Sequence, residues 1–288
     1  MKTNLFAISS LVLAVGICAL GSGCSHAQAD EDDDGDDSEV GISQADLSAP
    51  GFTTPQYWGA KFLRTYQAKL DASERAVATE AGPAAPFAKK RAVLLITGVT
   101  IPAAWFDPLV ARLKRDGFEP TVYEPPNLLA GSLYQNSADL GAVVERVKKA
   151  SGQEKIDILA ECTGGLIARH YVQSLGGEKS VSRLVTFVSP QHGIAKAPLA
   201  AAIVRWQATH DLSPGSRFLN EVNAKSMPTE VPFTSIYTCT DEYIRPYQTS
   251  IVPGANNIGL GCNGVFVGHF QTFYDPAIYR VMYGALTK

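Results

Sequence analysis

The residues best suited to chemistry lie in one short stretch, residues 159–165, which reads Leu-Ala-Glu-Cys-Thr-Gly-Gly. An apolar run typical of a buried strand precedes it, and a helical pattern follows it. A strand, a sharp turn and a helix form a nucleophile elbow, in which small residues flank a side chain at a strained backbone angle. Ala160 and Gly164 occupy the small positions and Cys162 the centre. This pattern predicts a cysteine nucleophile for acyl transfer.

Acyl transfer also requires a base, a group that orients the base, and donors for the oxyanion. In a fold with such an elbow the expected chain order is nucleophile, acid, histidine. Cys162, Asp241 and His269 follow this order, and Asp241 comes directly after the expected strand 233–238. The acid has two alternatives, Glu242 and Asp275. His192 is interpreted as a structural hydrogen-bonding residue.

Strand and helix patterns alternate along the chain. Because such alternation is typical of βαβ units, it predicts a mostly parallel central sheet with helices on both faces. Residues 51–288 show no internal linker and are predicted to form one domain. The expected strands are 92–96, 118–123, 156–159, 183–188 and 233–238. The expected helices are one or two within 54–81, then 103–116, 138–151, one after the elbow, and 275–286.

The order of the motifs resembles the α/β-hydrolase lipases, in particular the bacterial class 2 lipases and the B-type yeast lipases. Residues 93–98 look like the oxyanion loop of that family, with Thr97 in place of its His or Pro. The other similar segments are 160–165, 188–193, 211–219, 240–242 and 267–269. The resemblance implies the α/β-hydrolase fold and carboxylic-ester hydrolysis. It also implies that the backbone N–H groups of Val99 and Thr163 bind the oxyanion.

The five cysteines divide into a leader pair and three in the body of the chain. Cys18 and Cys24 belong to the leader. Cys239 precedes the acid and Cys262 precedes the histidine, so a disulfide between them would connect the two loops; it is worth about 3 kcal/mol in the chain-entropy model. Cys162 then remains the free thiol.

A thiol needs less activation than a hydroxyl, because its free pKa lies near 8.5. An imidazolium in contact with Cys162 is expected to favour the thiolate over the opposing charge of a more distant Glu161. Glu161 itself has no assigned role. Cys-His-Asp sets in the superfamily also occur in polyester-active enzymes, so two alternatives stay open. One is an acyltransferase or polyester-active enzyme, and the other is an inactive binding protein on the same fold.

The N-terminus reads as an export signal. Lys2 precedes an apolar run at residues 5–20, which predicts a signal peptide over residues 1–23. Residues 20–24 resemble a lipobox that would lipidate Cys24 and attach the protein to a membrane; residues 27–29 offer an ordinary secretion site instead. The acidic run 30–39 lacks the spaced ligands of a calcium loop, so residues 24–50 are expected to form a flexible tether.

The body of the chain, residues 40–288, has 24 basic and 20 acidic side chains. It lacks the clustered cations and interleaved aromatics of a nucleic-acid-binding protein. No cofactor and no metal are expected. The sequence therefore predicts an exported monomer that acts on small-molecule, lipid or polyester esters.

Overall fold

The computed structural model describes residues 43–82 and 90–288. Contacts divide the chain into two units, residues 1–52 and 53–288. In the first unit, helix α2 (Gln44–Ser48) begins at a capping box formed by Ser43 and Asp46. The predicted signal peptide, Cys24 and the tether up to residue 42 lie outside the described residues. Residues 43–50, the part of the predicted tether that the structure describes, thus contain one short helix.

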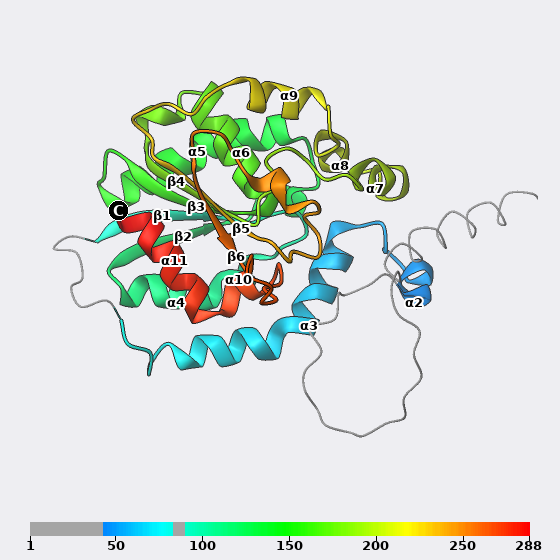
Figure 1. Cartoon of the computed structure of the whole chain (residues 1–288), viewed down its shortest axis with the longest axis horizontal. Coiled ribbons are helices and arrows are strands. Elements are labelled where there is room, and N and C mark those ends of the chain that lie inside the picture. The colour runs from blue at the N-terminus through cyan, green and yellow to red at the C-terminus, as the bar shows by residue number, and fades with distance from the viewer. Residues whose placement is uncertain (1–42, 83–89) are drawn as a thin grey trace, which may run out of the picture. The chain divides into compact units, whose positions relative to one another are not determined.

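The second unit contains a six-stranded sheet with every strand pair parallel (Figure 1). The strands are β1 (Arg91–Ile96), β2 (Phe118–Tyr123), β3 (Ile156–Glu161), β4 (Val181–Phe187), β5 (Phe233–Thr238) and β6 (Asn256–Leu260). Their order across the sheet is β2-β1-β3-β4-β5-β6. All six residues of β3 are buried, because parallel strands are covered by helices on both faces.

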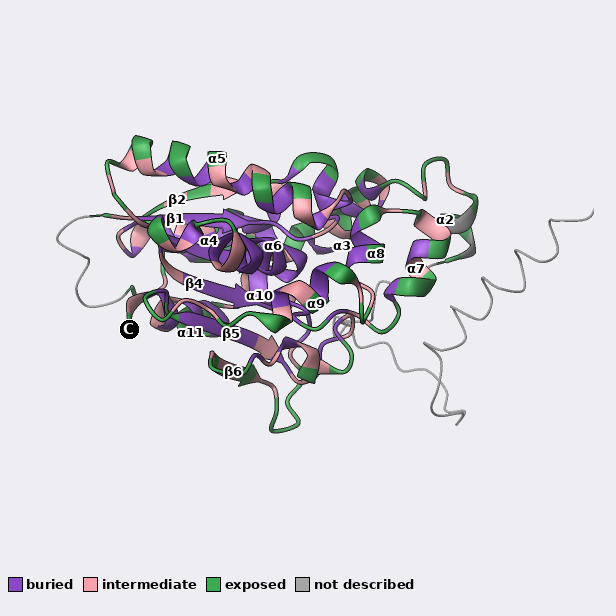
Figure 2. Ribbon diagram, turned by 90° about the horizontal axis from the view of Figure 1, so that it is seen from above, coloured by how far each residue is buried: buried purple, intermediate pink, exposed green. Residues whose placement is uncertain are grey.

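Helices cover both faces of this sheet (Figure 1). The second unit has the helices α3 (Pro55–Ala76), α4 (Asp107–Arg115), α5 (Leu133–Ser151), α6 (Cys162–Ser174), α7 (Ala197–Val204), α8 (Gln207–Asp211), α9 (Arg217–Ala224), α10 (Gln271–Tyr274) and α11 (Pro276–Thr287). Helices α5, α6 and α9 lie on one side, and α4, α10 and α11 on the other. Burial is concentrated in the inner strands β1, β3, β4 and β5 and in the helix sides that face them, whereas the edge strands β2 and β6 are mostly exposed or half-buried (Figure 2). No helix among the described residues is both long and apolar enough to span a membrane.

Local signals account for the boundaries of α5. Its N-cap Ser132 accepts a hydrogen bond from the Gln135 N–H, and it ends at Gly152, whose φ of 65° is a left-handed conformation that glycine adopts without strain. The helix starts five residues before the predicted start at Ala138. The predicted interval 54–81 contains one continuous helix, α3.

The edge strand β6 was not predicted, nor were the helices of the excursion 193–232, which is the long connection between β4 and β5. Strand β6 reads Asn-Asn-Ile-Gly-Leu, and Asn and Gly are depleted in strands. The excursion contains α7, α8 and α9, which are short. The first of them occupies most of the apolar stretch 197–206.

Candidate active site

Cys162 lies at the turn between β3 and α6. It is the first residue of α6 and has a φ of 45°, a left-handed conformation that strains a residue with a Cβ atom. The turn is packed tightly: a Cβ atom at Gly164 would lie 2.7 Å from the Thr97 carbonyl oxygen, and one at Gly165 would lie 2.6 Å from Ser189 Oγ. Small residues are therefore required at both positions, as in a nucleophile elbow.

Asp241 and His269 come together although 28 residues separate them. Asp241 follows β5, His269 precedes α10, and His269 Nδ1 lies 2.8 Å from Asp241 Oδ2. The other carboxylate oxygen of Asp241 accepts hydrogen bonds from the Tyr243 N–H at 2.8 Å and the Ile244 N–H at 2.7 Å. Burial favours the neutral acid, but the charge of His269 and these hydrogen bonds keep the pKa of Asp241 below its ordinary value.

The alternative acids have other partners. Glu242 Oε2 accepts a hydrogen bond from the backbone N–H of His269 at 2.7 Å, so it holds the loop and not the ring. Asp275 is the N-cap of α11. His192 Nδ1 lies 3.0 Å from the Thr249 carbonyl oxygen, in keeping with a structural role. Of the three predicted acids, Asp241 is the one in contact with the imidazole.

Glu161 also contacts the imidazole, on the side opposite Asp241. Its Oε1 lies 3.2 Å from His269 Nε2, and its Oε2 accepts a hydrogen bond from the Gly98 N–H at 2.7 Å. The side chain is fully buried, and burial raises the pKa of Glu161 above its ordinary value. The sequence analysis left this residue without a role, because no sequence pattern connects it to Gly98 or to His269.

The thiol of Cys162 is buried beside the same groups. The ligand atoms of Glu161, Cys162 and His269 all lie within 4.8 Å of one another, so the carboxylate is not a distant charge for the thiol. Burial, with the charge of Glu161, raises the pKa of Cys162 despite the opposing effect of His269. The expected thiolate is thus corrected to a neutral thiol. Burial opposes protonation of His269, but the charge of Asp241 raises the pKa of His269 well above its ordinary value.

The two backbone groups predicted to bind the oxyanion flank the elbow. Thr163 is buried in the first turn of α6, where free N–H groups and the helix dipole favour an anion. Val99 follows Gly98, and a Cβ atom at Gly98 would lie 2.8 Å from the Cys162 Cβ. Within the described residues, the Val99 N–H has no hydrogen-bond partner.

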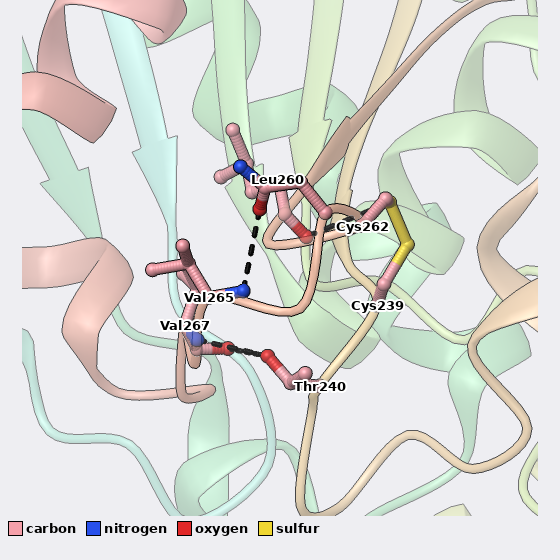
Figure 3. Close-up of a disulfide and its surroundings, with 7 residues drawn as sticks. Cys239, Thr240, Leu260, Cys262, Val265 and Val267 are labelled. Carbon is pink, nitrogen blue, oxygen red and sulfur yellow. Dashed lines mark hydrogen bonds between the residues drawn. A yellow bond between two sulfur atoms is a disulfide. The ribbon is translucent and has the colours of Figure 1, made fainter.

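A disulfide joins Cys239 and Cys262, the pair expected from the cysteine positions (Figure 3). Next to it, Thr240 Oγ1 accepts a hydrogen bond from the Val267 N–H at 2.8 Å and lies 3.1 Å from the Val267 carbonyl oxygen. The loops that carry Asp241 and His269 are therefore connected by a covalent bond and by hydrogen bonds. A pocket of about 440 Å³ opens beside them, with Asp241 and Phe266 in its lining.

The chain is similar to known hydrolases in sequence. The family model of palmitoyl protein thioesterases matches residues 127–251. Lipase B of Pseudozyma antarctica is 26% identical over 168 residues, which are 57% of this chain and 49% of that relative. The matched region thus spans about half the length of the curated relative.

Solved structures with the same fold include two lipases. The mature lipase BlEst2 of Bacillus licheniformis has 16% identity and a TM-score of 0.56, with 71% of this chain and 95% of that chain covered. Lipase B of Aspergillus fumigatus has 18% identity and a TM-score of 0.59, with 72% and 55% covered. The chain therefore has the α/β-hydrolase fold. Its sequence is similar to lipases and thioesterases, which are ester and thioester hydrolases.

Proposed function

We propose that the protein is a carboxylic-ester hydrolase that uses Cys162 as nucleophile, His269 as base and Asp241 as the acid that orients the base. The observation that carries this proposal is the 2.8 Å contact between Asp241 and His269, made beside a strained elbow cysteine. The similarity to lipases and thioesterases supports the reaction class.

The proposed reaction begins from the form in which His269 Nε2 has lost its proton, and the raised pKa of His269 places this form at higher pH than for an ordinary histidine. In that form His269 Nε2 takes the thiol proton while Cys162 Sγ attacks the acyl carbonyl, and the N–H groups of Val99 and Thr163 stabilise the oxyanion. The imidazolium then gives its proton to the departing alcohol, which leaves a thioester on Cys162. A water molecule, deprotonated by His269, hydrolyses the thioester and restores the thiol.

The nature of the substrate is part of the proposal. Small-molecule, lipid or polyester esters fit the apolar runs 99–106, 128–134 and 264–270, which are proposed to line the site, and the similarity to palmitoyl protein thioesterases favours long acyl groups. Export and a lipid anchor at Cys24 are also proposed, on the basis of the leader sequence. If Cys24 carries the anchor, Cys24→Ala should release the protein from the membrane fraction.

The test exposes the full chain briefly to a p-nitrophenyl ester and then analyses its peptides by mass spectrometry. We expect an acyl adduct on the peptide that contains Cys162, and loss of ester hydrolysis in Cys162→Ala and in His269→Ala. His192→Ala removes an exposed histidine and is the matched control, expected to keep its activity. An adduct on another residue, or full activity in Cys162→Ala, would contradict the proposal.

Cys162→Ser separates the proposed enzyme from one of the two alternatives, an inactive binding protein. In the active enzyme, serine is a weaker nucleophile, so ester hydrolysis should fall. A gain of hydrolysis in Cys162→Ser, with no adduct on the unmodified protein, would mean that the natural chain is an inactive member of the fold.

A further inference from the structure

Three different metal-ligating side chains meet at the elbow. Glu161 supplies a carboxylate, Cys162 a thiol and His269 an imidazole, and their ligand atoms all lie within 4.8 Å of one another. All three residues are buried, with exposed fractions of 0%, 6% and 4%. The cluster thus differs from the exposed acidic groups that are common on protein surfaces.

One of the three spacings in this cluster already suits a tetrahedral ion. Zinc binds nitrogen and oxygen at about 2.0–2.2 Å and sulfur at about 2.3 Å, so its ligand atoms lie about 3.3–3.6 Å apart. Glu161 Oε1 and His269 Nε2 are 3.2 Å apart. Small side-chain movements would bring all three atoms to coordination distance and leave the fourth position for water.

Two of the three ligands, His269 and Glu161, are already oriented by a hydrogen bond to another residue. Asp241 holds His269 Nδ1 at 2.8 Å, which directs Nε2 toward the cluster. The Gly98 N–H holds Glu161 Oε2 at 2.7 Å, which leaves Oε1 facing His269. Carboxylate–histidine pairs of this kind fix the ring and raise its affinity in zinc sites.

We propose that Glu161, Cys162 and His269 bind one zinc ion. A thiolate and an imidazole favour zinc over calcium or magnesium, which prefer oxygen ligands. On binding, the Cys162 thiol and the protonated Nε2 of His269 release their protons to solvent, and lone pairs of the sulfur and of Nε2 go to the metal, without any change of oxidation state. Bound zinc would also occupy Cys162 Sγ and His269 Nε2, and it should therefore inhibit ester hydrolysis reversibly. The inhibition rests on the proposed function, whereas zinc binding does not.

Cobalt(II) is a spectroscopic probe of the site. We expect the full, chelator-treated chain to bind one Co²⁺ with a sulfur-to-cobalt charge-transfer band, which added Zn²⁺ removes by competition. Cys162→Ser should abolish the band, because it replaces the thiolate. Glu161→Gln and Asp241→Asn should weaken binding, the latter by about 10–100-fold, as for other groups that orient a ligand. His192→Ala is the control and should bind as the natural chain does.

A second measurement needs no variant. Zn²⁺ should protect Cys162 from iodoacetamide, and a chelator should restore the reaction, as read by mass spectrometry of the Cys162 peptide. A charge-transfer band that persists in Cys162→Ser would assign the metal to another thiol and overturn the proposal. So would unprotected Cys162 at saturating Zn²⁺. If no acyl adduct forms on Cys162 while metal binding is intact, only the proposed hydrolase function would be contradicted.

Discussion

The proposed nucleophile and the proposed acid–base pair are held by different means. Cys162 lies on the strand–turn–helix of β3 and α6, where the residues from 162 to 172 are all buried. Asp241 and His269 lie on loops beyond the strands and are held by the disulfide Cys239–Cys262 and by contacts between the loops. Backbone geometry thus determines the position of Cys162, whereas long-range connections determine that of His269.

This contrast separates two kinds of sensitivity. A change in the elbow should alter packing and stability together, because the turn lies in the core. A change in the loop connections should affect the alignment of the base and leave the thiol in place. The predictions below test this separation.

The largest expected effect is that of Asp241→Asn. The amide removes the charge that stabilises the imidazolium and can favour the wrong tautomer, so kcat for ester hydrolysis should fall about 10³–10⁴-fold. Glu242→Gln is the matched control, because Glu242 binds the backbone of His269 and not its ring. A greater loss in Glu242→Gln would reverse the assignment of the acid.

Loss of the disulfide should have the next largest effect. The double variant Cys239→Ser/Cys262→Ser should lower the free energy of unfolding by about 3 kcal/mol, measured by denaturant titration. The value of kcat should also fall, while the rate of Cys162 alkylation stays close to that of the natural chain. An altered alkylation rate with unchanged kcat would contradict the separation of the two regions.

Gly164→Ala tests the packing of the elbow. The new Cβ atom would meet the carbonyl oxygens of Thr97 and Ile96 at 2.7 and 2.9 Å, so we expect a loss of about 1–3 kcal/mol in stability. Gly284→Ala in α11 has open space around its Cβ position and should be neutral or stabilising. Equal melting temperatures for the two variants would show that the elbow tolerates a side chain at this position.

Glu161→Gln should have the smallest effect, on the titration of the thiol. Removal of the carboxylate charge takes away one of the two causes that raise the pKa of Cys162. The pH dependence of iodoacetamide alkylation should therefore move to lower pH. A profile that stays in place would mean that burial alone keeps the thiol neutral.

The sequence was sufficient for the elements whose signals are local. The apolar run before Cys162 and the small residues around it predicted β3, the turn and α6, and the order of the motifs predicted the α/β-hydrolase fold. Strand β6 was missed because its Asn and Gly residues resemble a loop. Its strand geometry comes from pairing with β5, which a local pattern does not show.

The role of Glu161 could not be inferred from the sequence for the same reason. Its partners Gly98 and His269 are 63 and 108 residues away, and only the folded sheet brings them together. Burial and, after it, the charge of Glu161 raise the pKa of Cys162, so the expected thiolate was wrong. By contrast, the disulfide partners could be proposed from cysteine positions alone, since few cysteines remain once the leader and the elbow are assigned.

The close approach of Gly98 to Glu161 has a consequence for engineering. A Cβ atom at position 98 would meet Glu161 Oε2 and would lie 2.8 Å from the Cys162 Cβ, so a shorter residue at position 161 removes only one of the two close contacts. A library randomised at positions 98 and 161 should therefore return glycine at position 98 whichever residue stands at 161. Redesign of the loop that follows β1 must therefore keep Gly98.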